Sequence, residues 1–416
     1  MMAAGQAEAV ALLTTSARLL FTSGQTSERT IDSVVRLGEA LGLKASLALA
    51  WGECALRVRT QDGTEAVHLV PAVPAGVDMN KVALTLDIME EVCEGRRAPG
   101  DALAALEAVG HKPPASLPRF ALFAGAGAAA LAVIFGATDP ASLAVIFASA
   151  AAGACLRRGL AHLFPNPLPQ PLGAALLAGL VAAAAGRLLP SSAVFLIALC
   201  PCMVLVPGPH LLNSALDLAR LRLPLGGARL GFASLVILLI CVGLIAGLTA
   251  GGQNLPASGG GASVPLLFDV LAAGIAVSAY GTFFSMPWRM LPFPMAVGMA
   301  AHALHWAALS LGAGLAFAAF LACLVVGAVV TPVANRLRLP FAAAAFASVV
   351  SLIPGSFVFR MSADLVGITA SGSGAPALLT AAVMNGATAL TIMVAMAFGL
   401  ILPKMLIEDL SPPTYP

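Results

Sequence analysis

Residues 206–218 read Val206-Pro-Gly-Pro-His-Leu-Leu-Asn-Ser-Ala-Leu-Asp-Leu218, and 147 residues later the chain reads Ile353-Pro-Gly-Ser-Phe-Val-Phe-Arg-Met-Ser-Ala-Asp-Leu365. Each stretch follows an apolar run. Three positions coincide: Pro207 with Pro354, Gly208 with Gly355, and Asp217 with Asp364. The same offset carries the first apolar span onto the sixth and the fifth onto the tenth. A repeat of this length predicts two copies of one structural unit.

The composition separates a soluble piece from a membrane piece. The 416 residues are 59% hydrophobic and only 10% charged, with a mean hydropathy of +0.94, whereas soluble domains carry roughly 25% charged residues. Residues 1–118 hold 24 of the 42 charged side chains. We therefore expect a soluble domain followed by an integral membrane domain, which argues against a single globular enzyme. The net charge of +2, without a basic patch interleaved with aromatic residues, gives no indication of a nucleic acid partner.

The soluble piece, residues 1–118, is predicted to be a small α+β domain. Apolar residues recur at helical spacing over 9–42, with a break at 23–27, and again over 81–94 and 102–109. The short apolar runs between these segments are typical of strands. The first twenty residues lack the basic and apolar regions of a secretory signal, so we expect this domain in the cytoplasm.

Residues 1–118 contain no GxSxG, HExxH, P-loop or GxGxxG motif of a catalytic site. The seven cysteines of the chain are scattered without a CxxC pair, and most lie in or beside apolar segments, so neither a metal nor a cofactor is predicted. The missing motifs argue against a membrane-anchored hydrolase or peptidase with this domain as its catalytic unit, which is the alternative to a membrane transporter. An uncoupled channel is a further alternative.

Ten apolar stretches approach the ~20 residues that a membrane span needs. They are 119–136, 140–156, 172–187, 191–206, 228–250, 264–283, 295–312, 314–334, 340–354 and 376–402. Five fall in a first half, residues 119–250, and five in a second half, residues 251–416. Because five is odd, the second half enters the bilayer with the opposite orientation, which predicts an all-α membrane domain of two five-helix inverted repeats.

Lysine and arginine in the short loops predict the orientation of these spans. If residues 1–118 lie inside, nine basic residues fall in inside segments: Arg157, Arg158, Arg220, Arg222, Arg229, Arg289, Arg336, Arg338 and Lys404. Only Arg187 and Arg360 fall outside. Both termini are therefore expected in the cytoplasm.

The two Pro-Gly breaks are the first candidate for a transport site. Pro207 and Gly208, like Pro354 and Gly355, interrupt a helix beside the membrane, and freed backbone groups at that depth are tolerated only inside protein or beside a water-filled cavity. An amphipathic stretch follows each break. In the first, Asn213 and Asp217 share a helix face; in the second, Arg360 and Asp364 share one and are spaced to pair. The alternative is that both stretches are elbows on the membrane surface with solvated acids.

Few other polar residues fall inside the spans. Asp269 lies within the sixth span, where an ionisable group is a functional-site hypothesis, although a position near the outer interface would leave it wet. His302 and His305, three residues apart in the seventh span, are candidates for a proton relay or for purely structural roles. We place substrate binding or coupling on Pro207, Gly208, Asn213, Asp217, Asp269, Pro354, Gly355, Arg360 and Asp364.

The chain resembles the threonine/serine exporter family, in the fused form that carries both membrane halves. The resemblance covers nearly all of the chain. It lies in Ser23-Gly-Gln-Thr-Ser-Glu-Arg29, in Gly76-Val-Asp-Met-Asn-Lys81, in the two Pro-Gly-containing stretches and in Gly227-Ala-Arg229. Around the first motif the sequence departs from the family pattern, because Glu28 precedes Arg29 and Thr30 follows it.

The resemblance implies export of L-threonine and L-serine across the bacterial inner membrane, driven by the proton gradient as an antiport. It implies no cofactor, and a cytoplasmic domain followed by ten spans in the lipid bilayer. The role of that domain, and whether the chain forms a homo-oligomer, stay open.

Overall fold

The computed structural model describes residues 4–60, 63–189, 191–254, 264–336, 341–370 and 375–410. Of the sequence predictions, the inside position of Arg338 and the first residue of the span 340–354 lie outside the described residues.

The N-terminal part combines four helices with one sheet. Its elements are α1 (Ala4–Thr22), α2 (Ser27–Ala40), β1 (Lys44–Ala50), β2 (Gly52–Arg59), β3 (Glu65–Ala72), α3 (Met79–Cys93) and α4 (Pro99–Gly110). The strands pair antiparallel in the order β1-β2-β3. On β2, Cys54, Leu56 and Val58 are buried while Arg57 and Arg59 are exposed, because successive side chains of a strand point to opposite faces. The buried face packs against a core with Leu13 of α1 and Leu106 of α4.

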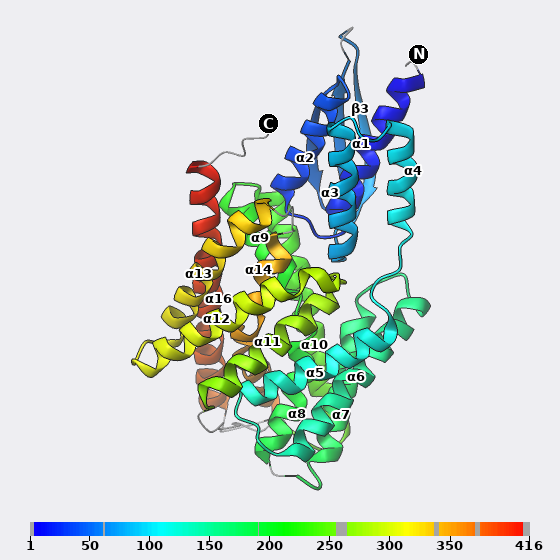
Figure 1. The fold of residues 1–416 in the computed structure, drawn as a ribbon. Helices are drawn as coiled ribbons and strands as arrows, with labels where there is room; N and C mark the ends of the chain where they lie inside the picture. Colours follow the sequence, from blue (N-terminus) through cyan, green and yellow to red (C-terminus); the bar gives the residue numbers. More distant parts are fainter. Residues whose placement is uncertain are drawn as a thin grey trace.

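Twelve further α-helices follow in the described residues. They are α5 (Leu117–Ile134), α6 (Pro140–Leu163), α7 (Pro169–Ala185), α8 (Ser191–Met203), α9 (Gly208–Ala219), α10 (Leu223–Ala250), α11 (Leu266–Phe283), α12 (Pro292–Ser310), α13 (Leu315–Arg336), α14 (Phe341–Val349), α15 (Gly355–Ala370) and α16 (Ala375–Leu410), with 3₁₀ turns at Trp288–Met290 and Val350–Leu352. They form one bundle, and the N-terminal part lies at one end of it (Figure 1).

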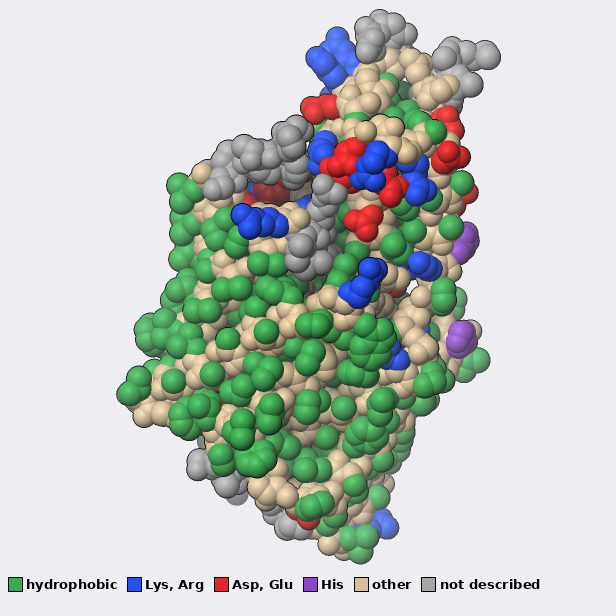
Figure 2. Space-filling view, viewed as in Figure 1, with side chains coloured by type: hydrophobic (Ala, Val, Ile, Leu, Met, Phe, Trp, Pro, Cys, Tyr) green, Lys and Arg blue, Asp and Glu red, His purple; other side chains and the backbone are tan. Residues whose placement is uncertain are grey.

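The bundle has the surface of a membrane protein. Apolar side chains cover the visible face of the helices, whereas charged side chains gather at the N-terminal part (Figure 2). Among the described residues, six helices are long and apolar enough to cross a membrane, or up to eight if each of two bent helix pairs is counted as one span. The chain is therefore a multi-pass, mainly helical membrane protein.

Both bent pairs lie at the Pro-Gly sequences. α8 and α9 meet at 58°, and the helical segment of α14 with its 3₁₀ turn meets α15 at 64°. The breaks pack tightly: a Cβ on Gly208 would come 1.4 Å from Cζ of Phe346 in α14, so only glycine fits there. Gly355 in turn lies against Met203 of α8, where a Cβ would come 3.2 Å from the side chain.

The neighbours of the helices follow a repeated pattern. α7 packs against α10 and α13 against α16; α5 packs against α6 and α11 against α12; α9 packs against α10 and α15 against α16. Across the two halves, α9 contacts α14, α15 contacts α8, and α5 packs against α11.

Candidate functional site

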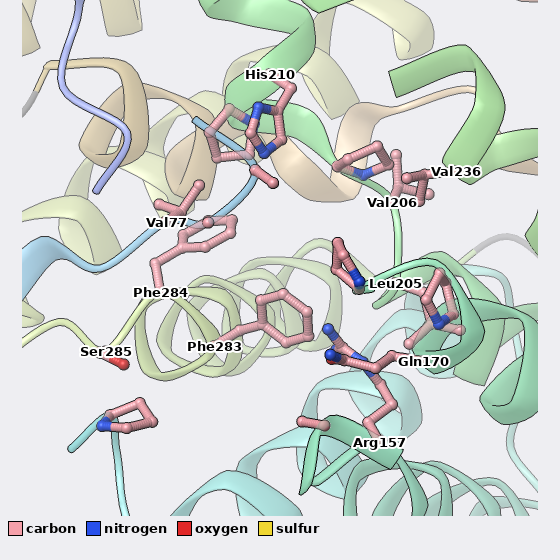
Figure 3. A pocket seen from close by; sticks show the side chains of 18 of the residues that line it. Val77, Arg157, Gln170, Leu205, Val206, His210, Val236, Phe283, Phe284 and Ser285 are labelled. Carbon is pink, nitrogen blue, oxygen red and sulfur yellow. The ribbon is translucent and has the colours of Figure 1, made fainter. Parts of the chain in front are cut away.

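A cavity of about 650 Å³ lies between the N-terminal part and the membrane helices. Its walls come from the loop between β3 and α3, the C-terminal ends of α6 and α11, the N-terminal end of α7, the first Pro-Gly break and α10. Figure 3 shows how residues from these segments surround it: Val77, Arg157, Gln170, Val206, His210, Phe283 and Ser285. Of the residues that the sequence placed at a site, only Pro207 lines this cavity.

The cavity wall carries positive but no negative side chains among the described residues that line it. The guanidinium of Arg157 lies 4.4 Å from the ring centre of Phe283. Arg158 also lines the cavity, and its Nη2 donates a hydrogen bond of 2.9 Å to the backbone oxygen of Ala115. The site therefore favours an anionic group over a cationic one.

Asn213 and Asp217 share a face of α9, as predicted, but that face meets the N-terminal part. Asn213 donates a hydrogen bond of 3.1 Å to the backbone oxygen of Gly24. The carboxylate of Asp217 accepts one of 3.0 Å from the hydroxyl of Ser27 and lies 3.3 Å from Nε of Arg229. The side chains of Asp217 and Arg229 are 3% and 2% exposed, so the hydrogen bond from Ser27 joins the N-terminal part to a buried ion pair of the bundle.

The predicted pair of Arg360 and Asp364 is wrong: the ion pairs of the described residues include none between them. Instead, Asn385 of α16 donates a hydrogen bond of 2.9 Å to the carboxylate of Asp364. The guanidinium of Arg360 lies 4.9 Å from the ring centre of Phe195 in α8. The physical reason is that α15 packs between α16 and α8, which draws the two side chains to different neighbours.

Two residues that the sequence named separately, Asp269 and His302, are brought together. Oδ2 of Asp269 on α11 lies 2.9 Å from Nδ1 of His302 on α12, and both side chains are buried. Nε2 of His302 is buried without a hydrogen-bond partner. The ring of His305 is 6.2 Å away, between ring centres.

The motif at the start of α2 contacts both halves of the bundle. Glu28 forms an ion pair with Arg220, which also pairs with Glu408 of α16 at 2.9 Å. Arg29 donates a hydrogen bond of 2.9 Å to Asn335 of α13. Burial raises the pKa of Glu28 above its usual range, although Arg220 opposes the shift.

Sequence reasoning missed Arg157 and the docking role of the motif. Arg157 was assigned to membrane topology because it lies in a basic pair at the end of an apolar run. The sequence signal that could have indicated a binding role is that no acidic residue lies near Arg157 in the chain to pair with it.

Two family models match the chain. One, described as "Putative threonine/serine exporter", matches residues 11–251, and the other, described as "Threonine/Serine exporter, ThrE", matches residues 269–406. No curated protein and no solved structure matches the chain.

Proposed function

The chain belongs to the threonine/serine exporter family, and from this we propose that it exports L-threonine and L-serine across the bacterial inner membrane in exchange for protons. Membership of an exporter family makes it a transporter and not an enzyme. The hydrolase alternative therefore loses its basis.

The proposed architecture is ten spans in two inverted five-helix units, preceded by a cytoplasmic domain. The repeated neighbour pattern of the helices supports it, with α5 to α10 as one unit and α11 to α16 as the other. The two bent pairs give one span each, and α7 and α12 complete the ten. Loop arginines such as Arg220 and Arg289 support a cytoplasmic position of the N-terminal part.

In this proposal, the substrate binds in the cavity at the first break. Its volume of about 650 Å³ lies within the ~300–1,000 Å³ of small-molecule sites. The two units move relative to each other at the breaks at Pro207 and Pro354. In transporters built from repeats, interrupted helices form the substrate site, and the units move against each other around it.

The buried pair of Asp269 and His302 carries the proposal of proton coupling. A carboxylate and an imidazole in hydrogen-bond contact, in a part of the bundle with few other polar groups, can hold and release a proton. Asp269 lies 14 residues before the end of α11 at the cavity, which corresponds to about 21 Å of helix. A proton that enters from the side opposite the N-terminal part therefore meets the pair before it reaches the substrate.

The test is threonine efflux from proteoliposomes with an imposed proton gradient. We expect Asp269→Asn and His302→Gln to lose gradient-driven efflux while threonine exchange without a gradient is retained. Asp139→Asn is the matched control, because Asp139 is an exposed N-cap of α6 and asparagine caps a helix equally well. Unchanged gradient-driven efflux in Asp269→Asn contradicts the assigned role. A wild type that never responds to the gradient favours the uncoupled channel.

A further inference from the structure

Arg157 is a half-buried cation without a counter-charge in the described structure. Its Nε and Nη1 atoms are buried and have no hydrogen-bond partner. Burying an unpaired charged group is costly, and proteins compensate such charges with an opposite charge or with hydrogen bonds. Because the side chain of Arg157 is only half-buried and lines a cavity of about 650 Å³, a negatively charged group of a ligand in that cavity can supply the missing counter-charge.

Other arginines of the bundle either have a partner within the protein or do not line the cavity. Arg119 donates to the backbone oxygen of Met286 at 2.7 Å, and Arg158 donates to that of Ala115 at 2.9 Å. Arg229 is paired with Asp217. Nε of Arg360 is also buried without a partner, but Arg360 does not line the cavity. Arg157 therefore combines an unpartnered guanidinium with access to the cavity.

Two aromatic rings hold the guanidinium of Arg157. Its Cζ lies 4.4 Å from the ring centre of Phe283 and 5.7 Å from that of Phe120. Stacking against an aromatic face fixes the plane of a guanidinium and leaves its N–H groups free at the edge. Figure 3 shows Arg157 and Phe283 side by side at the cavity. The fork is thus held in place before a ligand arrives.

We propose that Arg157 binds the carboxylate of the transported amino acid. The planar fork of an arginine matches a carboxylate with two parallel hydrogen bonds, which a lysine cannot reproduce. This inference rests on the proposed function, since it takes the substrate to be a small amino acid. It adds a substrate-binding residue on α6, before the first break.

The cavity also predicts an asymmetry in recognition. Among the described residues that line it there is no aspartate or glutamate to pair with the ammonium group of the substrate. Gln170 and Ser285 offer polar groups without charge. A ligand that lacks the carboxylate should therefore lose more affinity than a ligand whose ammonium is blocked.

The experiment measures binding of labelled L-threonine to the purified full-length protein, with two competitors. L-Threoninamide lacks the carboxylate, and N-acetyl-L-threonine lacks the ammonium. For the wild type we expect L-threoninamide to compete about 10–100-fold more weakly than L-threonine, the range for losing hydrogen bonds to a charged group. N-Acetyl-L-threonine should compete better than L-threoninamide.

In Arg157→Gln, binding of L-threonine should weaken by about 10–100-fold, and the difference between L-threonine and L-threoninamide should disappear. Arg157→Lys should keep part of the preference for L-threonine over L-threoninamide. Arg158→Gln is the matched control: it removes the same charge from the adjacent residue at the same cavity, and we expect it to keep the difference. Thermal unfolding of each variant verifies that it is folded.

The outcomes separate the two proposals. A folded Arg157→Gln protein that still prefers L-threonine over L-threoninamide overturns the role of Arg157 and leaves the exporter function standing. Equal loss of preference in Arg158→Gln also overturns it, because a diffuse positive field would then explain the result. A wild type that binds no L-threonine contradicts the proposed function, and this inference with it.

Discussion

Asp217 and Asp364 occupy equivalent positions in the repeat, but their carboxylates have different partners. Asp217 is buried against Arg229, whereas Asp364 is half-buried and accepts one hydrogen bond from Asn385. Removing one partner of a buried ion pair leaves an uncompensated charge. We therefore expect Asp217→Asn to lower the free energy of unfolding by about 3–5 kcal/mol.

The matched control is Asp364→Asn, which should cost about 1 kcal/mol. Chemical unfolding of both purified variants measures the two losses. Equal losses would mean that the buried contact of Asp217 with Arg229 contributes no more to stability than a single hydrogen bond.

Glu28 makes the contact of the N-terminal part with the bundle sensitive to pH. Burial raises its pKa in the folded state, so the folded protein holds this proton more tightly than the unfolded chain. The stabilisation from protonated Glu28 is therefore fully present below the pKa of Glu28 in the unfolded chain. It is lost as the pH rises through the pKa of Glu28 in the folded protein. Glutamine mimics the protonated side chain. We expect Glu28→Gln to match the wild type at low pH and to become the more stable protein as the pH rises.

Thermal unfolding of both proteins between about pH 4 and 8 tests this expectation. If Glu28→Gln becomes the less stable protein as the pH rises, the ion pair with Arg220 outweighs burial, and the sign of the pKa shift is wrong.

At this scale, sequence reasoning identified polar residues but not their partners. It named Asp269 and His302 as separate candidates, and the structure joins them across two helices. It assigned Arg157 to topology, because a basic residue after an apolar run has the same pattern whether it faces water or a cavity. Partners that lie far apart in the chain depend on packing, which a single sequence does not contain.

At the scale of helices, glycine determines how closely α7 and α10 approach. A Cβ on Gly247 of α10 would come 2.3 Å from the backbone oxygen of Leu176, whereas a Cβ on Gly231 of the same helix would meet nothing within 4 Å. We expect Gly247→Ala to destabilise the protein by about 1–3 kcal/mol through overpacking.

Gly231→Ala is the control on the same helix, and it should change stability by less than ~1 kcal/mol, because alanine favours a helix more than glycine does. Thermal unfolding of the two variants measures the difference. Equal effects of the two substitutions would show that α7 and α10 are free to move apart.

The sequence predicted where helices lie better than it predicted where they begin and end. The span expected at 228–250 is contained in α10, Leu223–Ala250, because a long apolar run has few other stable conformations in a membrane. The last span, expected to end at 402, continues to Leu410. Its final turns carry Lys404 and Glu408, which a hydropathy pattern excludes but which the helix keeps through their ion pair.

For the whole molecule, the contact of α2 with both halves constrains transport. Ser27 and Glu28 bind residues of the first half, and Arg29 binds Asn335 of the second. Transporters built from repeats alternate their access by moving one part against another. If the halves move in this way, the contact between Arg29 and Asn335 must open during the cycle, because the other two contacts hold α2 to the first half.

Covalent closure of this contact should therefore stop transport. We expect Arg29→Cys with Asn335→Cys, joined by a short thiol-cleavable cross-linker, to lose threonine efflux and to regain it after reduction. The control pair is Arg36→Cys with Glu90→Cys, whose side chains pair at 2.6 Å within the N-terminal part.

Both cross-linked proteins carry serine at Cys93 and Cys155, the two native cysteines that are not buried. The control cross-link joins α2 to α3 and leaves the contact with the bundle free, so it should not change efflux. Full efflux from the cross-linked Arg29→Cys, Asn335→Cys protein would mean that α2 keeps its contact with both halves throughout the cycle. The moving parts would then have to lie elsewhere, within each half rather than between the halves.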